Sequence, residues 1–260
     1  MPEFTGPYAQ GTPCWVELTV PDQQAALDFY GALFGWQGEI GPAEMGGYTV
    51  CTLHGKPVAG VMNATPPGPG QPVPPPVWTT YLAVDDADGA EKAVIAAGGS
   101  VMVPTMDVMN LGRMAVVIDP AGTVFGLWQA REFAGAQIVN ESGAVVWNEL
   151  HVPDATAASA FYRAALSLEA APMEGAEGYF SLNAEGRAVG GMAGLEHMAP
   201  GTPPHWLVYF AVDDPDATAA ALARAGGQVL LPPFDMIAGR MSVLQDPQGA
   251  VFAIINPTPM

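Results

Sequence analysis

The chain repeats one sequence pattern along its whole length. Residues 15–18 (WVEL) return as residues 147–150 (WNEL), an offset of 147 − 15 = 132. Residues 78–86 (WTTYLAVDD) return as residues 206–214 (WLVYFAVDD), an offset of 206 − 78 = 128. Such a repeat means that each copy forms the same structure, and the shrinking offset places short deletions in loops of the second copy. We therefore predict two homologous domains, residues 1–130 and residues 140–260, each large enough for a core of its own.

Each copy divides again into two modules. Residues 15–20 alternate as in a strand, and Asp22 and Gly35 fit the N-cap and C-cap of a helix with an apolar stripe. The short apolar runs at residues 47–53 and 56–62 predict antiparallel strands. After a proline-rich connector the pattern restarts, with a helix that begins at Asp86 and strands at residues 79–84, 101–103, 113–118 and 123–128. We predict an α+β fold of four βαβββ modules, two in each domain, with residues 130–140 as the bridge.

The composition limits the partners. The 26 acidic and 8 basic residues give a net charge of −18, which repels nucleic acid and an anionic membrane surface. No apolar run is long enough to span a bilayer, and residues 1–4 lack the features of a signal peptide, so we predict a cytoplasmic protein. Cys14 and Cys51 have no counterparts in the second copy, so we expect free thiols. The expected partner is a small molecule, and the chain is expected to be a monomer with two pseudo-symmetric domains or a homodimer.

Two motifs within this pattern resemble those of a known superfamily. The first is the strand-Asp-helix run with its Phe-Tyr pair, at residues 18–35 and 150–168, and the second is the Asp-Pro-x-Gly turn, at residues 119–122 and 246–249. Together they resemble the vicinal oxygen chelate superfamily of glyoxalases, bleomycin resistance proteins and extradiol dioxygenases. The resemblance covers nearly the whole chain and is closest to tandem two-domain members labelled hydroxylases, some of them mycobacterial antigens. It implies that each domain curls its sheet into a cup, the first cup in the first copy and the second cup in the second.

The resemblance also implies where a metal ion would be held. Members of the superfamily use His and Glu side chains at four cup-facing positions in each domain, and the ion polarises neighbouring oxygens of the substrate. Those positions fall here on Trp15, Gly60, Thr79 and Gly126 in the first copy and on Trp147, Gly191, Leu207 and Ala253 in the second. None of these eight residues is His, Glu, Asp or Cys, and tryptophan does not ligate metals. We therefore expect no metal and no other cofactor.

Strand alternation indicates which other side chains share the cup face. The predicted cup-facing set comprises Trp15, Glu17, Tyr81 and Trp128 in the first copy and Trp147, Glu149 and Tyr209 in the second. The resemblance places the opening strands of the two modules side by side, so Glu17 is expected near Tyr81 and Glu149 near Tyr209. A carboxylate in apolar surroundings has a raised pKa and can act as a general base, with the tyrosine as acid. The alternative is that each Glu–Tyr pair is a structural hydrogen bond.

Four further residues are candidate ligand contacts. Arg113 and Arg240 repeat in a chain with few bases, and they are expected either to orient an anionic group of the ligand or to neutralise the nearby glutamates. His151 and His205 share the cup face of Glu149 in the second copy only, so an atypical metal site there is an alternative to ligand contact. By strand alternation, the side chains of Trp78 and Trp206 point to the face of the sheet opposite the cup, and we predict that they pack beneath the helices.

Two functions compete on this basis. The first is a metal-independent binding protein for a small apolar molecule, aromatic or polyketide-like. The second is a metal-independent enzyme, an isomerase, lyase or so-called hydroxylase, that uses Glu17 or Glu149 as general base. The sequence shows no flavin, haem or iron motif that would activate oxygen. A third possibility, glyoxalase activity, follows from the resemblance alone.

Overall fold

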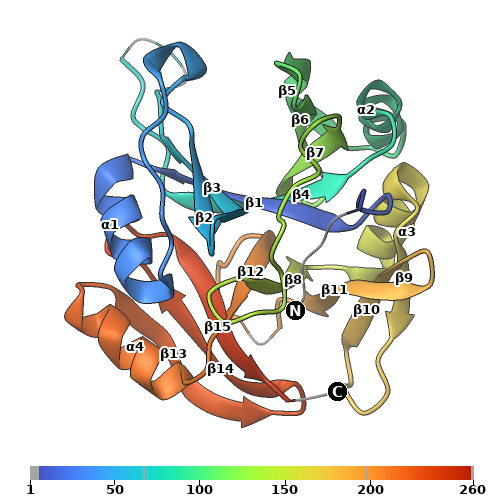
Figure 1. Ribbon diagram of the computed structural model, residues 1–260. Coiled ribbons are helices and arrows are strands. Elements are labelled where there is room, and N and C mark those ends of the chain that lie inside the picture. Colours follow the sequence, from blue (N-terminus) through green and yellow to red (C-terminus); the bar gives the residue numbers. More distant parts are fainter. Residues whose placement is uncertain (1–5, 67, 69, 197, 259–260) are drawn as a thin grey trace.

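The computed structural model describes residues 6–66, 68, 70–196 and 198–258, which form four helices and two mixed sheets (Figure 1). The predicted α+β class and the tandem modules are confirmed. Residues 1–4, on which the prediction about a signal peptide rests, lie outside this range. None of the described helices has both the length and the hydropathy needed to cross a membrane.

The first copy builds a seven-stranded sheet in the order β2-β3-β1-β4-β7-β6-β5. Its elements are β1 (Pro13–Val20), α1 (Gln23–Phe34), a short 3-10 helix (Ala43–Met45), β2 (Thr49–Leu53), β3 (Lys56–Asn63), β4 (Val77–Ala83), α2 (Ala87–Ala96), β5 (Ser100–Val108), β6 (Gly112–Ile118) and β7 (Val124–Ala130). The first module has a single bridge between Gln37 and Thr52 where the other modules have a full strand.

The second copy builds an eight-stranded sheet in the order β13-β14-β15-β12-β8-β11-β10-β9. Its elements are β8 (Val145–Val152), α3 (Ala155–Leu166), β9 (Glu169–Pro172), β10 (Tyr179–Ala184), β11 (Arg187–Gly194), β12 (His205–Ala211), α4 (Pro215–Arg224), β13 (Gln228–Met236), β14 (Gly239–Gln245) and β15 (Val251–Pro257). In each sheet the opening strands of the two modules are antiparallel neighbours, β1 with β4 and β8 with β12, as the resemblance implied.

Helix boundaries follow local chemistry. The Asp22 carboxylate accepts a hydrogen bond from the backbone N–H of Ala25, and Gly35 ends α1 with a left-handed φ of 76°. Asp86 occupies the N-cap position of α2 as predicted, but its side chain makes no capping hydrogen bond. The side chain of Gln129 on β7 instead accepts from the first helical N–H, that of Ala87.

The two sheets lie back to back, with helices on both flanks. In Figure 1 α1 and α4 lie together on the left and α2 and α3 on the right. The largest core cluster joins Leu18 and Tyr30 of the first copy to Phe210 and Phe252 of the second, and a second cluster beneath the helices likewise contains residues of both copies. The expectation of a separate core in each copy is therefore wrong, because α1 packs Phe34 against Phe210 of the other copy. In the same way α3 packs Tyr162 against Phe125.

The repeated motifs form the contact between the copies. The Tyr30 hydroxyl on α1 donates a hydrogen bond to Oδ2 of Asp246, 3.0 Å away in the Asp-Pro-x-Gly turn of the other copy, and accepts one from the Trp78 indole. Trp78 is buried at 4% exposure, as predicted from its parity. The second copy repeats this arrangement with Tyr162, Asp119 and Trp206. The Phe-Tyr pair and the Asp-Pro-x-Gly turn thus join the two halves of the fold.

Candidate functional site

The helix-free face of the first sheet, the first cup, carries a cluster of polar side chains around Glu17. The Tyr81 hydroxyl donates to Oε1 of Glu17 over 3.2 Å, which confirms the predicted proximity. A second tyrosine, Tyr48, also hydrogen bonds to Glu17 and accepts from the Trp15 indole over 2.8 Å. Glu17 therefore lies within hydrogen-bonding distance of two hydroxyls, and Trp15 fixes one of them.

Two tyrosines cover the glycines at the expected metal-ligand positions. A Cβ atom added at Gly60 would lie 1.9 Å from the Tyr48 hydroxyl, and one at Gly126 would lie 2.0 Å from the Tyr81 ring. Real side-chain atoms do not approach this closely, so no larger residue fits at either position while the tyrosines stay in place. Gly191 is covered in the same way by Tyr179, whose hydroxyl lies 1.8 Å from an added Cβ.

The second cup repeats the cluster around Glu149. Its Oε2 accepts from the Tyr179 hydroxyl over 2.7 Å, and its Oε1 accepts from the Tyr209 hydroxyl over 3.1 Å. The Trp147 indole donates to the Tyr179 hydroxyl over 2.9 Å. One addition distinguishes this cup: Nε2 of His151 lies 2.8 Å from Oε1 of Glu149, a close ionic contact when the imidazole is protonated.

The two glutamates consequently differ in acidity. Burial raises the pKa of Glu17 above its ordinary value of 4.5, and the hydrogen bonds from Tyr48 and Tyr81 offset this only in part. Burial acts in the same direction on Glu149, but the contact and charge of His151 outweigh it with the help of the two tyrosines, so the pKa of Glu149 is lowered. One pattern of residues thus produces a more easily protonated acid in the first cup and a more strongly ionised one in the second.

The linker between the copies contributes to the first cup. Phe133 packs edge-on against Trp15 with ring centroids 5.0 Å apart, and its carbonyl accepts from the Trp128 indole over 2.8 Å. Trp15 and Trp128 therefore lie at the cup as predicted, in an apolar cluster that also includes Tyr8 and Met114. Side chains of residues 131–139 therefore occupy part of the first cup. The second cup differs in having a pair of histidines.

Both cups have apolar walls that solvent can reach. On the outer strands of the first sheet, Met106 faces Met114 in register and is 50% exposed. On the second sheet, Phe234 faces Met241, and Leu231 faces Val243. Their partners across β14 and β15 are the cup-facing Ile255 and Ala253. These accessible methionine, leucine and phenylalanine side chains are typical of a surface that receives an apolar molecule.

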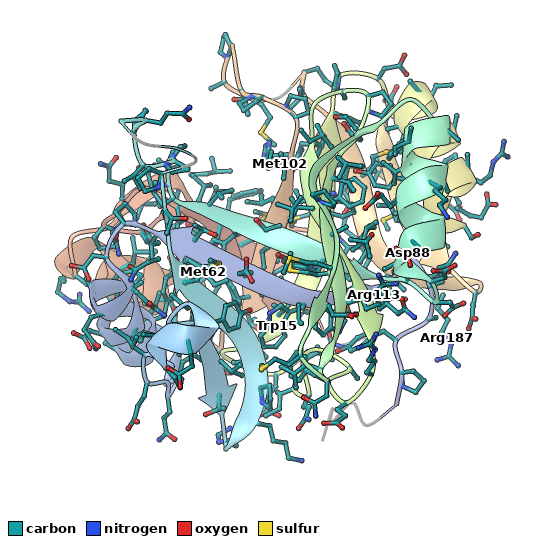
Figure 2. The ribbon with its side chains drawn as sticks, turned by 90° about the horizontal axis from the view of Figure 1, so that it is seen from above. Trp15, Met62, Asp88, Met102, Arg113 and Arg187 are labelled. Carbon is teal, nitrogen blue, oxygen red and sulfur yellow. The ribbon has the colours of Figure 1, made fainter. Side chains whose placement is uncertain are left out.

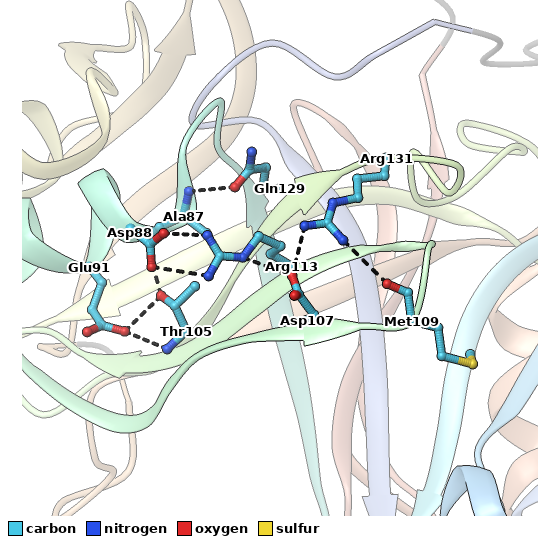
Figure 3. Close-up of polar contacts among 9 residues, drawn as sticks. All are labelled: Ala87, Asp88, Glu91, Thr105, Asp107, Met109, Arg113, Gln129 and Arg131. Carbon is cyan, nitrogen blue, oxygen red and sulfur yellow. Dashed lines mark hydrogen bonds and ion pairs between the residues drawn. The ribbon is translucent and has the colours of Figure 1, made fainter.

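The repeated arginines lie outside the cups. Arg113 is in register with Gln129, whose side chain reaches the start of α2, so both face the helix (Figure 3). Its guanidinium binds the carboxylate of Asp88 on α2, and its Nε lies 3.1 Å from Asp107. From above, Arg113 and Asp88 lie beside α2, apart from Trp15 (Figure 2). Arg240 binds Asp216 and Asp235 in the same manner. The prediction that these arginines lie near the cup glutamates is therefore wrong, because aspartates of their own sheet and helix bind them.

Sequence reasoning missed three members of the clusters. Tyr48 and Tyr179 repeat at an offset of 179 − 48 = 131, so the repeat itself could have identified them. They were missed because Tyr48 directly precedes β2 and Tyr179 is the first residue of β10, each after a turn that contains glycine, so neither lies within an alternating strand pattern. Phe133 has no counterpart in the second copy, and no sequence signal points to it.

The donor set does not fit the metal that the superfamily resemblance implies. The expected ligand positions carry indole, glycine, threonine, leucine and alanine, and tyrosine side chains fill the space over the glycines. Within the described part of the chain, no group of three or more His, Cys, Asp or Glu side chains is placed to hold a metal ion. The histidine alternative in the second cup is not supported either, because Glu149, His151 and His205 are not among any described group of side chains placed to hold an ion.

A separate hollow of about 350 Å³ opens on the flank between α1 and α4. Leu33, Phe34, Ser142 and Thr218 are among the residues that line it. It contains none of the glutamate, tyrosine or tryptophan residues of the two clusters, so the cups remain the better candidate sites.

The profile of the glyoxalase/bleomycin resistance protein/dioxygenase superfamily matches residues 13–127 and again residues 144–254. The chain belongs to this superfamily. Its two matches coincide with the two copies of the repeat, so the member is a tandem one.

Two relatives are similar to the chain over nearly its full length. The chain is 48% identical over 257 residues to the protein named "Putative glyoxylase CFP32" from Mycobacterium tuberculosis, with 97% of each chain covered. It is 40% identical over 263 residues to the "Anthracycline biosynthesis protein DnrV" of Streptomyces peucetius, covering 96% of this chain and 94% of that one.

Solved structures show the same fold at low identity. The Mn(II)-bound glyoxalase from Novosphingobium aromaticivorans has a TM-score of 0.65 and 18% identity, over 95% of this chain and 82% of that one. The 2,3-dioxygenase LapB from Pseudomonas sp. KL28 has a TM-score of 0.64 and 12% identity, over 98% and 94%.

Proposed function

We propose that the protein binds a small, flat, largely apolar aromatic molecule in its cups, through side-chain contacts rather than through a metal ion. The observation that carries this proposal is the replacement of the metal-ligand positions by a tryptophan and by glycines that tyrosines cover. The accessible apolar walls supply the driving force, and the glutamate and tyrosine at the floor supply hydrogen bonds that orient the molecule.

A relative's name supports the aromatic class of ligand. The 40% identical protein of Streptomyces peucetius is named for anthracycline biosynthesis, and anthracyclines are polycyclic aromatic compounds. That name describes the relative alone, but a polycyclic aromatic ring matches the walls formed by Phe234, Leu231 and Met241. The name of the mycobacterial relative suggests a glyoxalase instead, and the donor set of the cups argues against the metal-dependent form of that activity.

The expected affinity is moderate. Burial of about 300 Å² of an aromatic ligand at roughly 25 cal/mol/Å² contributes about 7.5 kcal/mol. The loss of translational and rotational freedom offsets several kcal/mol of this. Micromolar dissociation constants therefore require added hydrogen bonds from the glutamate or tyrosines.

Binding can be tested with the intrinsic tryptophan fluorescence, since Trp15 and Trp147 belong to the clusters. Titration with 2-hydroxyanthraquinone should quench this fluorescence in a saturable manner. Phe234→Glu places a charge on the wall of the second cup and should weaken binding there about tenfold or more. Ile237→Glu is the matched control, because Ile237 is 80% exposed in the turn after the same strand and should leave binding unchanged. Equal behaviour of the two variants would contradict binding in the second cup.

A second candidate function is acid–base catalysis in the first cup. The buried Glu17, with its raised pKa and its hydrogen bond from Tyr81, is suited to exchange a proton with a bound substrate. An isomerase, lyase or hydroxylase-type reaction of this kind would disappear in the double variant Glu17→Gln and Glu149→Gln. Turnover that survives in the double variant would exclude this role.

A further inference from the structure

The second cup contains a pair of stacked histidines that the first cup lacks. His151 on β8 and His205 on β12 are direct neighbours in register, and their rings stack with centroids 5.0 Å apart at an angle of 22°. The corresponding positions of the first copy are Thr19 (151 − 132 = 19) and Val77 (205 − 128 = 77), which are likewise register neighbours. The backbone is thus the same in both cups, and only the second has the imidazoles.

The nitrogens of the pair are unequally satisfied. Nδ1 of His205 lies 2.8 Å from the carbonyl oxygen of Pro203, so this nitrogen carries the hydrogen and donates it. Burial, the largest effect, lowers the pKa of His205 and favours the neutral ring. His151 is only 3% exposed, and its Nε2 lies 2.8 Å from Glu149. Neither of its buried ring nitrogens makes a hydrogen bond of ordinary geometry with a described residue: Nε2 has only the close contact with the Glu149 carboxylate, and Nδ1 has no partner.

This arrangement is that of a base held by a carboxylate. When His151 is neutral with its hydrogen on Nε2, the proton faces Glu149 and the lone pair of Nδ1 is available to a ligand. A buried polar atom that has no protein partner is costly, and a ligand atom can satisfy it. The apolar side chain of Leu207 lies on the same face, two residues after His205 on β12 and in register with Glu149, and would contact the ring of such a ligand.

We propose that the second cup selects aromatic molecules that carry a ring hydroxyl, and that His151 takes the proton of this hydroxyl. The O–H bond breaks, its electron pair stays on oxygen as a phenolate, and the proton forms a bond to Nδ1. The resulting imidazolium lies between the phenolate and the Glu149 carboxylate, which balances its charge. Glu149 is a positioning residue in this scheme, and neutral His205 is the ring on which His151 stacks.

The choice of an aromatic hydroxyl follows from acidity. Phenols ionise at a pKa of about 10 or below, whereas aliphatic alcohols are far weaker acids, so an aromatic hydroxyl gives up its proton to an imidazole much more readily. The inference rests on the proposed function, because it assigns a substituent to the aromatic ligand proposed above. It also assigns a different role to each cup, since Thr19 and Val77 cannot accept a proton in this way.

The test uses 4-nitrophenol, whose phenolate absorbs visible light, and reads binding and ionisation separately. Tryptophan quenching reports binding, and the absorbance of the bound probe at neutral pH reports the ratio of phenolate to phenol. The test variant carries His151→Thr and His205→Val, which the matching positions of the first copy show to be compatible with the fold. Thr19→Val in the first cup is the control that leaves the histidines intact.

We expect the full-length wild-type protein and the Thr19→Val control to bind the probe and to increase its phenolate fraction. The double variant should show a phenolate-to-phenol ratio at least about tenfold lower for bound probe, while circular dichroism remains unchanged. Quenching by 4-nitrophenol without a gain of phenolate in the wild type, or an equal gain in the double variant, would overturn this inference and leave the proposed function standing. No quenching by either 4-nitrophenol or 2-hydroxyanthraquinone would overturn both.

Discussion

Replacement of each cup glutamate by glutamine should affect stability to very different extents in the two cups. Glu149 accepts hydrogen bonds from two tyrosines and faces His151 at 2.8 Å. A hydrogen bond to a charged group contributes about 1.5–3 kcal/mol and one to a neutral group about 0.5–1.5 kcal/mol, so two such bonds lose about 2 kcal/mol together. Loss of the carboxylate that contacts Nε2 of His151 adds about 1 kcal/mol or more. Glu149→Gln should therefore lower the free energy of unfolding by about 3 kcal/mol at pH 7.

Glu17→Gln should cost much less. Burial already disfavours the ionised form of Glu17, and a neutral amide avoids that cost while it keeps hydrogen bonds with Tyr48 and Tyr81. We expect a change within about 1 kcal/mol of the wild type at pH 7.

The pH dependence separates the two variants further. The folded-state pKa of Glu17 is raised, so its stabilising contribution is complete at low pH and is lost as the pH rises through that value. The folded-state pKa of Glu149 is lowered, so its contribution is present above the ordinary value of 4.5 and is lost as the pH falls through the lowered value. Between low pH and pH 7, Glu17→Gln should therefore gain stability relative to the wild type, and Glu149→Gln should lose it.

Urea unfolding followed by circular dichroism at several pH values measures both trends. Adding His151→Thr to Glu149→Gln should recover part of the loss, because the two side chains are coupled. Equal losses for the two glutamine variants at pH 7, or parallel pH trends, would refute the assignment of different environments to the two cups.

Three further outcomes are expected. Tyr30→Phe removes hydrogen bonds that join the two copies and should lower the free energy of unfolding by about 1–3 kcal/mol, measured by urea denaturation. Gly60→Ala should destabilise by about 1–3 kcal/mol because its Cβ meets the Tyr48 hydroxyl, whereas Gly6→Ala, with open space around it, should be neutral in the same assay. Arg113→Gln should change the dissociation constant for 2-hydroxyanthraquinone less than twofold, since this guanidinium faces α2; a larger effect would place it at the ligand.

Much of the fold could be predicted from the sequence, because the repeat predicts two similar copies and the periodic patterns predict the same helices and strands in each. Local alternation alone predicts that Trp78 is buried, and together with the neighbouring strands that the resemblance implied it pairs Glu17 with Tyr81; the structure confirms both. The positions of Arg113 and Arg240 could not be predicted in this way, because each binds an aspartate of the preceding helix, Asp88 or Asp216, that local alternation does not connect to it.

The cores that the two copies share could not be predicted from local sequence patterns either. An apolar stripe on α1 shows that the helix is covered, but it does not show that the second copy provides Phe210 and Phe252 as part of the cover. The difference between the cups likewise depends on which side chains approach across strands. The 2.8 Å contact between His151 and Glu149 reverses the effect of burial on the carboxyl, and no single strand contains that information.

The central claim is that the cups hold an organic ring directly and need no metal ion for it. The most direct measurement is the dissociation constant for 2-hydroxyanthraquinone after exhaustive treatment with a chelator, compared with the value after addition of Mn²⁺, with metal analysis of the same samples. Saturable micromolar binding that is the same in both samples, with no stoichiometric metal retained, is the predicted result. Binding that appears only when the metal is added, together with one retained ion per cup, would contradict it.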